Sequence, residues 1–327
     1  MPEQADAWRA GFCRSIPERP ASATRPARAA SFQRCHGGLT LTQPTREPLF
    51  PLGHFYSPIV DTESLAADAA RVWPERPDPL GIDFNDAEHR YLLTEVFPGL
   101  LKDFDYPDTE DAAANSGFFN QNDQFSWLDA RTLFVLLRHL RPKRVIEVGS
   151  GFSSLLMADV NRRFFAGDMH FTCIEPYPRQ FLVDGVDGIT RLVTRRVQDV
   201  DAELWSELAA GDVLFIDSSH VAKTGSDVNH LCFEVLPRLR PGVLVHVHDI
   251  FLPQDYLKEW AIAQNRSWNE QYVVQALLMY SFAFRVKFGC AYAYLRLPEL
   301  VQRALALPNG EVYGGGSLWI ERLDAGR

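Results

Sequence analysis

Hydrophobic positions follow two alternating periods in the second half of the chain, and this alternation predicts repeated strand–helix units. From Ser126, apolar residues recur at helical spacing until Pro142 (Trp127, Ala130, Leu133, Phe134, Leu137 and Leu140). Short apolar runs then predict strands at 144–149, 170–175, 189–197, 212–217 and 242–249, with helices between them at 153–165, 178–183, 201–209 and 225–239. Repeated units of this kind imply a mostly parallel sheet with helices on both faces.

The pattern continues to the end of the chain with two more helices and two more strands. The helices are predicted at 253–262 and 269–280, and the strands at 284–295 and 317–322. Three glycines at 314–316 predict a turn before the last strand. The two added strands complete a sheet of seven.

The first 125 residues lack this regular alternation and divide into two parts. Residues 1–48 are rich in Ala, Pro, Arg and Ser without a period, which indicates a disordered tail. Residues 49–125 are expected to form a cap or lid before the main domain at 126–327, with residues 102–125 as a loop over a cleft. Five aromatic residues are candidates for a lid that excludes water, or else for packing of the cap against the sheet: Phe55, Tyr56, Phe118, Phe119 and Trp127.

The distribution of net charge along the chain indicates which kind of binding partner to expect. The chain of 327 residues has a net charge of −9, but its first 48 residues carry seven arginines and four acids, a net +3, so the remainder carries −12. An acidic body disfavours nucleic-acid binding, which needs a cationic surface, and favours a small-molecule partner. No apolar run approaches the length of a membrane span, no secretory signal is recognisable, and the five cysteines form no close pair, so a cytoplasmic protein is expected.

The most informative motif is the stretch 144–151, Arg-Val-Ile-Glu-Val-Gly-Ser-Gly. An apolar strand followed by a glycine turn and a helix start makes a crevice where a ligand approaches the backbone and the free N–H groups of the helix. A dinucleotide site needs a third glycine at position 154, which is Ser154 here. A nicotinamide oxidoreductase is therefore disfavoured.

The motifs after this strand resemble, in order, those of the class I S-adenosylmethionine-dependent methyltransferases of the methyltransferase-24 type. The resembling stretches are 144–151, Ile-Glu-Pro-Tyr-Pro (174–178), Val-Gln-Asp-Val (197–200), Phe-Ile-Asp-Ser-Ser-His (215–220) and His-Val-His-Asp-Ile (246–250). The resemblance implies a Rossmann-like methyltransferase fold with S-adenosylmethionine held by Glu147, Gly149 and Gly151. It implies little about the substrate. A hydroxylase-like protein or a silent S-adenosylmethionine-binding protein on the same fold remains an alternative.

Two acids after the glycine turn are candidates for the remaining cofactor contacts. Glu175 ends the second strand, where a carboxylate accepts hydrogen bonds from the ribose hydroxyls. Asp199 follows the third strand and is placed to accept from the adenine amino group. The alternatives are an ordinary surface acid for Glu175 and a helix N-cap for Asp199.

Four residues at the ends of the fourth and fifth strands are candidates for the chemistry: Asp217, His220, His248 and Asp249. Asp217 and Asp249 resemble the metal-holding acids of O-methyltransferases similar to catechol O-methyltransferase, although Ile250 stands where a further ligand is expected. With a histidine as ligand, the site would prefer a transition metal to magnesium. Without a metal, His220 is the candidate base. The sequence thus favours O-methylation of a small molecule, with the need for a divalent metal left open.

Overall fold

The computed structural model describes residues 47–78, 81–112, 117–305 and 314–324. The expected tail at 1–48 lies outside these residues except for its last two positions. The strands are β1 (Arg144–Val148), β2 (His170–Ile174), β3 (Arg191–Val193), β4 (Val213–Ile216), β5 (Leu244–Val247), β6 (Phe284–Gly289) and β7 (Leu318–Arg322). The helices that follow β1 onward are α6 (Phe152–Phe165), α7 (Gln180–Asp184), α8 (Asp227–His230), α9 (Glu270–Leu278), α10 (Cys290–Arg296) and α11 (Pro298–Leu305). Those before it are α1 (Thr62–Ala67), α2 (Ala69–Val72), α3 (Asp86–Tyr91), α4 (Phe97–Leu100) and α5 (Trp127–Leu140).

The seven strands form one sheet in the order β3-β2-β1-β4-β5-β7-β6. The first five in this order run parallel, and β7 is antiparallel to both β5 and β6. Connections from β1 lead outward through β2 and β3, and the chain then returns to β4 on the other side of β1. The strand order therefore reverses between β1 and β4, which is where open parallel sheets bind ligands at the carboxyl ends of their strands. This confirms the predicted mostly parallel sheet of seven strands.

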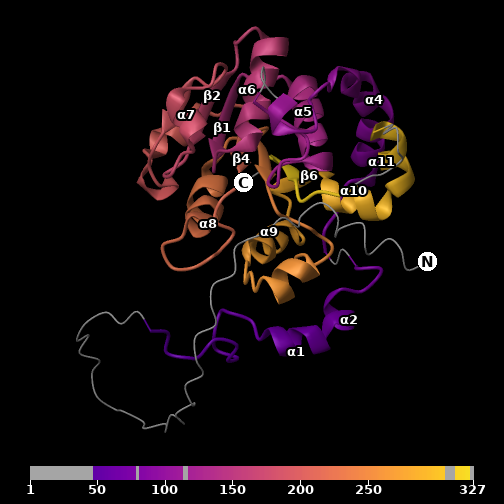
Figure 1. Ribbon diagram of the computed structural model, residues 1–327, viewed down its shortest axis with the longest axis vertical. Coiled ribbons are helices and arrows are strands. Elements are labelled where there is room, and N and C mark those ends of the chain that lie inside the picture. The colour runs from indigo at the N-terminus through magenta and orange to yellow at the C-terminus, as the bar shows by residue number, and fades with distance from the viewer. Residues whose placement is uncertain (1–46, 79–80, 113–116, 306–313, 325–327) are drawn as a thin grey trace.

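Alternate residues of the strands enter two separate cores, one on each face of the sheet. Val145, Phe171, Phe215 and Trp319 belong to the core covered by α4, α5, α6, α10 and α11. Their neighbours on the other face join the core covered by α8 and α9. Figure 1 shows these two groups of helices on opposite sides of the sheet. Burial on both faces explains why the central strands have near-continuous apolar runs.

Several predicted elements differ from the structure. The helix at 225–239 is α8 followed by a π-helical and a 3₁₀ turn, and the strand at 189–197 is reduced to β3. The predicted strand at 284–295 ends at Gly289, and α10 follows at once, packing its Cys290 against Thr132 of α5 (3.3 Å, Sγ to Oγ1). The predicted helix at 253–262 is reduced to a π-helical turn at Glu259–Ala263, and the helix at 201–209 is a 3₁₀ helix at Ala202–Glu207. The apolar spacing of these short segments fits more than one element, so tertiary packing decides between them.

The expected loop at 102–125 contributes to the core more than its composition suggested. Tyr106, Phe118 and Phe125 are buried in the core on the α5 side. The side chain of Asn122 satisfies backbone polar groups that this burial removes from water. Its Oδ1 accepts from the N–H of Phe125 (2.6 Å) and its Nδ2 donates to the carbonyl of the same residue (2.8 Å). The expectation of a loop outside the packed core was therefore wrong for these aromatic residues.

The segment before α3 lies against the stretch between β5 and α9. The N–H of Val60 donates to Oγ of Ser267 (3.1 Å), and Nε1 of Trp73 donates to the carbonyl of Tyr256 (2.7 Å). Phe55 and Tyr56, expected in a lid, are 79% and 63% exposed. Among the described residues, no helix is both long enough and apolar enough to span a bilayer.

Candidate active site

Two neighbouring cavities open at the carboxyl ends of the parallel strands. The first, of about 250 Å³, lies over the turn between β1 and α6, and Glu175 is among its lining residues. The second, of about 360 Å³, lies over the ends of β4 and β5 and is lined by His220, His248 and Asp249. Gln124 and Asp217 line both cavities. A ligand in the first would therefore face a ligand in the second across these two side chains.

The turn between β1 and α6 depends on a glycine at position 149. Gly149 has a φ of +79°, and its N–H donates to the carbonyl of Ile174 (3.0 Å). A Cβ atom there would lie 1.8 Å from the carbonyl oxygen of Asp217. Only glycine allows the ends of β1 and β4 to approach so closely, and this approach brings Asp217 to the rim of the first cavity.

Glu147 holds the start of α6 after this turn and lines neither cavity. Its carboxylate is fully buried and accepts hydrogen bonds from Oγ of Ser153 (2.6 Å) and Oγ of Ser154 (2.5 Å) at the start of α6. Ser154 also accepts a hydrogen bond from the N–H of Gly151 (2.9 Å). Burial raises the pKa of Glu147 to about 7, against the opposing effect of the two serine hydroxyls. The structure thus gives Glu147 a place in holding the turn and not in the lining of either cavity.

The pKa of Glu147 predicts a pH-dependent contribution to stability. A carboxyl group whose folded pKa exceeds its unfolded value stabilises the fold at low pH, and this stability is lost as the pH rises toward about 7. Compared with the Glu147→Gln variant, the wild type should lose about 1–3 kcal/mol of unfolding free energy between pH 5 and pH 8. Urea unfolding of both proteins at several pH values measures the difference. A constant difference would contradict the prediction.

The two predicted acids beyond the turn lie in different surroundings. Glu175 lines the first cavity, where its carboxylate accepts from the backbone N–H groups of Ser150 (3.2 Å) and Tyr177 (2.8 Å). Asp199 instead pairs with the guanidinium of Arg196 at 2.7 and 2.9 Å on the surface and is absent from the lining of this cavity. Its side chain is engaged by a neighbour three residues away, so the structure gives no support to the predicted adenine contact.

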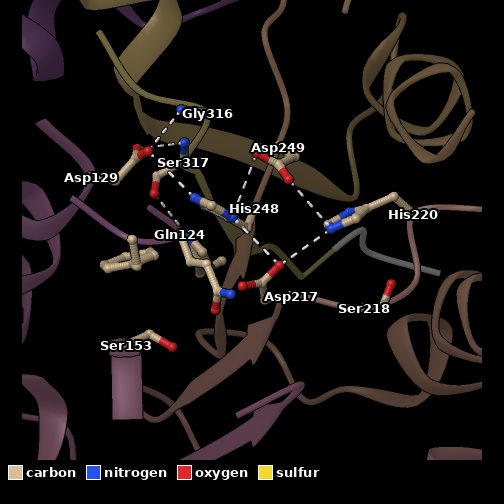
Figure 2. A network of polar contacts seen from close by, with 12 residues as sticks. Gln124, Asp129, Ser153, Asp217, Ser218, His220, His248, Asp249, Gly316 and Ser317 are labelled. Atoms are coloured by element: carbon tan, nitrogen blue, oxygen red, sulfur yellow. Dashed lines mark hydrogen bonds and ion pairs between the residues drawn. The ribbon is translucent and has the colours of Figure 1, made fainter. Parts of the chain in front are cut away.

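The four predicted catalytic residues meet in one cluster, which Figure 2 shows with both imidazole rings turned toward Asp217 and Asp249. Nε2 of His220 lies 3.3 Å from Asp217 and 3.4 Å from Asp249. Nδ1 of His248 lies 3.4 Å from Asp217 and 3.6 Å from Asp249. His220 and Asp249 have positive φ angles of 60° and 56°, so both side chains project from turns at the strand ends. The sequence therefore identified a group that the fold does assemble.

Opposite charges in this cluster shift its pKa values strongly. Burial alone lowers the pKa of His220, but hydrogen bonds with Asp217 and Glu270, together with the nearby carboxylates, raise it to about 10. Burial opposes charge at His248 too, yet Asp249 and Asp217 raise the pKa of His248 well above its usual value. The pKa of Asp217 is held low by His248 and His220 despite burial, whereas burial raises that of Asp249. The neutral imidazole expected at His220 is therefore disfavoured in these surroundings.

Two buried acids that the sequence did not single out hold the two histidines. Glu270, in the first turn of α9, lies 3.0 Å from Nδ1 of His220. Asp129, in the first turn of α5, lies 3.4 Å from Nε2 of His248 and accepts from the N–H groups of Gly316 (3.0 Å) and Ser317 (2.8 Å). Each comes from a helix far from its histidine in the sequence. In the sequence, both are acids in the first turn of a predicted helix. Acids are common at that position in any helix, so their role could not be recognised.

Comparisons with known proteins agree with this geometry. The family model of the methyltransferase-24 type, described as a methyltransferase domain, matches residues 146–250. An uncharacterised protein from Archaeoglobus fulgidus is 37% identical over 164 residues, which span 49% of this chain and 74% of that protein. The sheet order, with an antiparallel β7 between β5 and β6, is that of the resembling fold. The chain belongs to the class I S-adenosylmethionine-dependent methyltransferases.

Two solved structures cover a larger share of this methyltransferase, but their structural similarity to it is low. A candidate O-methyltransferase from Klebsiella pneumoniae is 16% identical with a TM-score of 0.37, covering 74% of this chain and 98% of the other. The S-adenosylhomocysteine-bound methyltransferase PaMTH1 from Podospora anserina is 15% identical with a TM-score of 0.38, covering 85% and 100%. Similarity this weak carries no conclusion about the acceptor.

The second cavity of the methyltransferase has aromatic walls in addition to its polar cluster. Trp127, Phe251, Trp260 and Trp268 line it, together with Leu257. The indole of Trp268 packs against the ring of His220 with 4.4 Å between centroids. Of the five aromatics proposed for a lid, Trp127 lines this cavity and Phe118 is buried in the core. The walls come mostly from the segment between β5 and α9, in which the sequence predicts a helix at 253–262.

Proposed function

We propose that this methyltransferase transfers the methyl group of S-adenosylmethionine to a hydroxyl group of a small molecule bound in the second cavity. The observation that carries the proposal is the position of Asp217, which lines both cavities and lies 3.3 Å from His220. A sulfonium methyl at the end of the first cavity would face a hydroxyl held against the cluster of Asp217, His220 and Asp249.

In this proposal Glu175 and the glycine turn bind the cofactor. Glu175 is already fixed by two backbone N–H groups, which leaves its remaining lone pairs available to the ribose hydroxyls. Gly149 and Gly151 allow the cofactor to approach the backbone, and Glu147 acts through the serines that it holds. Asp199 has no place in this arrangement.

The acceptor oxygen attacks the methyl carbon in line with the leaving sulfur. The new C–O bond forms as the C–S bond breaks, the electron pair of the broken bond stays on sulfur, and S-adenosylhomocysteine results. The hydroxyl proton passes to the carboxylate of Asp249, whose pKa burial raises, beside the protonated imidazole of His220 that Glu270 orients. Much of the rate would come from holding oxygen and methyl in contact away from water.

A divalent cation fits the same cluster as a second element of the proposal. Asp217, His248 and Asp249 each offer a ligand atom, and these atoms lie within 4.8 Å of one another. A nitrogen and two carboxylate oxygens suit a first-row transition metal, and Ile250 is buried and cannot add a ligand. Such a cation lowers the pKa of a bound hydroxyl. Asp129 would then orient His248 through its other ring nitrogen.

Calorimetric titration with S-adenosylmethionine, S-adenosylhomocysteine and NAD tests the cofactor assignment. We expect micromolar binding of the first two and none of NAD. Thermal melts with EDTA, Mg²⁺, Mn²⁺ and Zn²⁺ test the metal site independently of activity, with stabilisation expected from the transition metals. A hydroxylated small molecule that gains one CH₂ unit by mass spectrometry would identify the acceptor class. Absence of binding by either sulfur-containing ligand would overturn the proposal.

A further inference from the structure

We propose that Arg266 selects an acceptor that carries a carboxylate, and that the acceptor is a flat hydroxyarene. Arg266 lies between the π-helical turn at Glu259–Ala263 and α9, and it lines the second cavity. This inference rests on the proposed function, because it places the methylated hydroxyl of the same molecule at His220. It goes beyond that function in naming the chemical class of the acceptor.

The guanidinium of Arg266 contacts two indoles of the aromatic wall. Its Cζ lies 4.3 Å from the ring centroid of Trp260 and 4.8 Å from that of Trp268, and the planes of the two indoles differ by 74°. Contact with both rings restricts the position of the guanidinium, whose planar set of N–H groups receives a carboxylate in two parallel hydrogen bonds. A lysine in this place would have no such fork.

Arg266 also lacks the acidic partner that other cationic side chains near the site have. Within the part of the chain that the structure describes, no carboxylate lies within ion-pair distance of its guanidinium, whereas His220 and His248 each contact several acids. It is also the sole Arg or Lys among the described residues that line this cavity. Burial lowers its pKa, which indicates that it is partly withdrawn from water. A fixed, partly desolvated and unpaired cation favours an anionic ligand.

The distance between Arg266 and His220 suits a ligand that consists of one small ring. His220 and Arg266 both contact the indole of Trp268, so they lie no farther apart than the sum of those two contact distances. A hydroxybenzoate places its hydroxyl and its carboxylate at opposite ends of one ring, with a flat apolar middle. The indole and phenyl walls match that middle, and the cavity volume lies within the usual range for small-molecule sites, roughly 300–1,000 Å³.

The charges of the cavity argue against the opposite choice, a cationic acceptor. Aromatic boxes bind cations through their ring faces. Here the guanidinium of Arg266 already covers faces of Trp260 and Trp268. Three of the four acids that line the cavity are similarly engaged, since Asp129, Asp217 and Asp249 all contact a histidine, which leaves Asp123. A cationic amine would meet Arg266 without an indole cage to receive it.

A matched pair of probes tests the proposal: protocatechuate, a dihydroxybenzoate, and its primary amide. Binding is read from quenching of tryptophan fluorescence, because three tryptophans line the cavity. Wild-type protein should bind the acid about tenfold to a hundredfold more tightly than the amide, as expected for a charge-assisted hydrogen-bonded pair. Arg266→Gln should abolish this preference while leaving the affinity for the amide unchanged, and Arg266→Lys should restore only part of it.

The exposed Arg303 on α11 provides the control. Arg303→Gln removes the same charge from the protein outside both cavities, so it should retain the full preference for the acid. Equal binding of acid and amide by the wild type, or a preference that survives in Arg266→Gln, would overturn the inference. The measurement does not need methyl transfer. If the acid binds through Arg266 but neither probe is methylated with S-adenosylmethionine, the proposed function fails while the role of Arg266 stands.

Discussion

Replacing His220 by Asn is expected to lower kcat for methyl transfer by about 10²–10⁴-fold, the usual size of a proton-transfer contribution, because it removes the cation beside the carboxylates that take up the hydroxyl proton. The affinity for S-adenosylhomocysteine should stay within about twofold of the wild-type value, because His220 lines the second cavity and not the first. Asn is the suitable replacement, since the residue has a φ of +60° and Asn tolerates the left-handed region. Single-turnover assays and calorimetry measure the two quantities.

His230 offers a matched control for this experiment. It ends α8, ten positions farther along the chain, and also lies beside an acid, with 3.7 Å between its Nδ1 and Glu234. It lines neither cavity, so His230→Asn should retain kcat even if it loses some stability. A small effect of His220→Asn on kcat, or equal losses in the two variants, would show that the cluster does not handle the proton.

Of the variants proposed here, Gly149→Ala is expected to lose the most unfolding free energy. It is also expected to abolish S-adenosylhomocysteine binding. The added methyl group would be forced into the carbonyl oxygen of Asp217, so the ends of β1 and β4 must separate. The left-handed backbone costs about 1–2 kcal/mol, and overpacking adds about 1–3 kcal/mol. Urea unfolding and calorimetry measure both effects.

Gly167→Ala is the control that distinguishes the cost of the left-handed backbone from the cost of the steric clash. Its φ of +80° nearly equals that of Gly149, but a Cβ atom there would meet nothing within 4 Å. Gly167→Ala should therefore show the backbone cost alone and bind the cofactor normally. If the two variants lost equal stability, the close contact between Gly149 and Asp217 would not exist in solution. The comparison stays informative even if Gly149→Ala proves too unstable to bind, because the stability difference is itself the predicted result.

The arrangement of acids and histidines shows how far one residue can depend on distant ones. His220 and His248 both contact Asp217 and Asp249, but Glu270 and Asp129 fix them from two different helices on opposite faces of the sheet. Asp129 in addition holds the N–H groups of Gly316 and Ser317 before β7. The cluster is therefore preorganised by both helical layers and by the last strand.

The sheet, the glycine turn and the edge where the polar cluster lies could all be predicted from local sequence. Local spacing carries that information, because strands buried on both faces need apolar runs and a turn with positive φ needs glycine. Asp217, His220, His248 and Asp249 were recognisable because residues at the carboxyl ends of parallel strands must meet at one edge. The same logic predicted an adenine contact for Asp199, whose carboxylate pairs in this structure with Arg196, three residues away.

The side chains that surround this cluster, and the charges they carry, depend on how distant parts of the chain pack together. Glu270 and Asp129 became partners of histidines through helix packing. The segment between β5 and α9 became an aromatic wall that keeps only a π-helical turn of the helix predicted at 253–262. The pKa of His220 follows from three acids brought together from three parts of the chain. Burial and charge proximity are properties of the folded molecule, and the period of a sequence does not contain them.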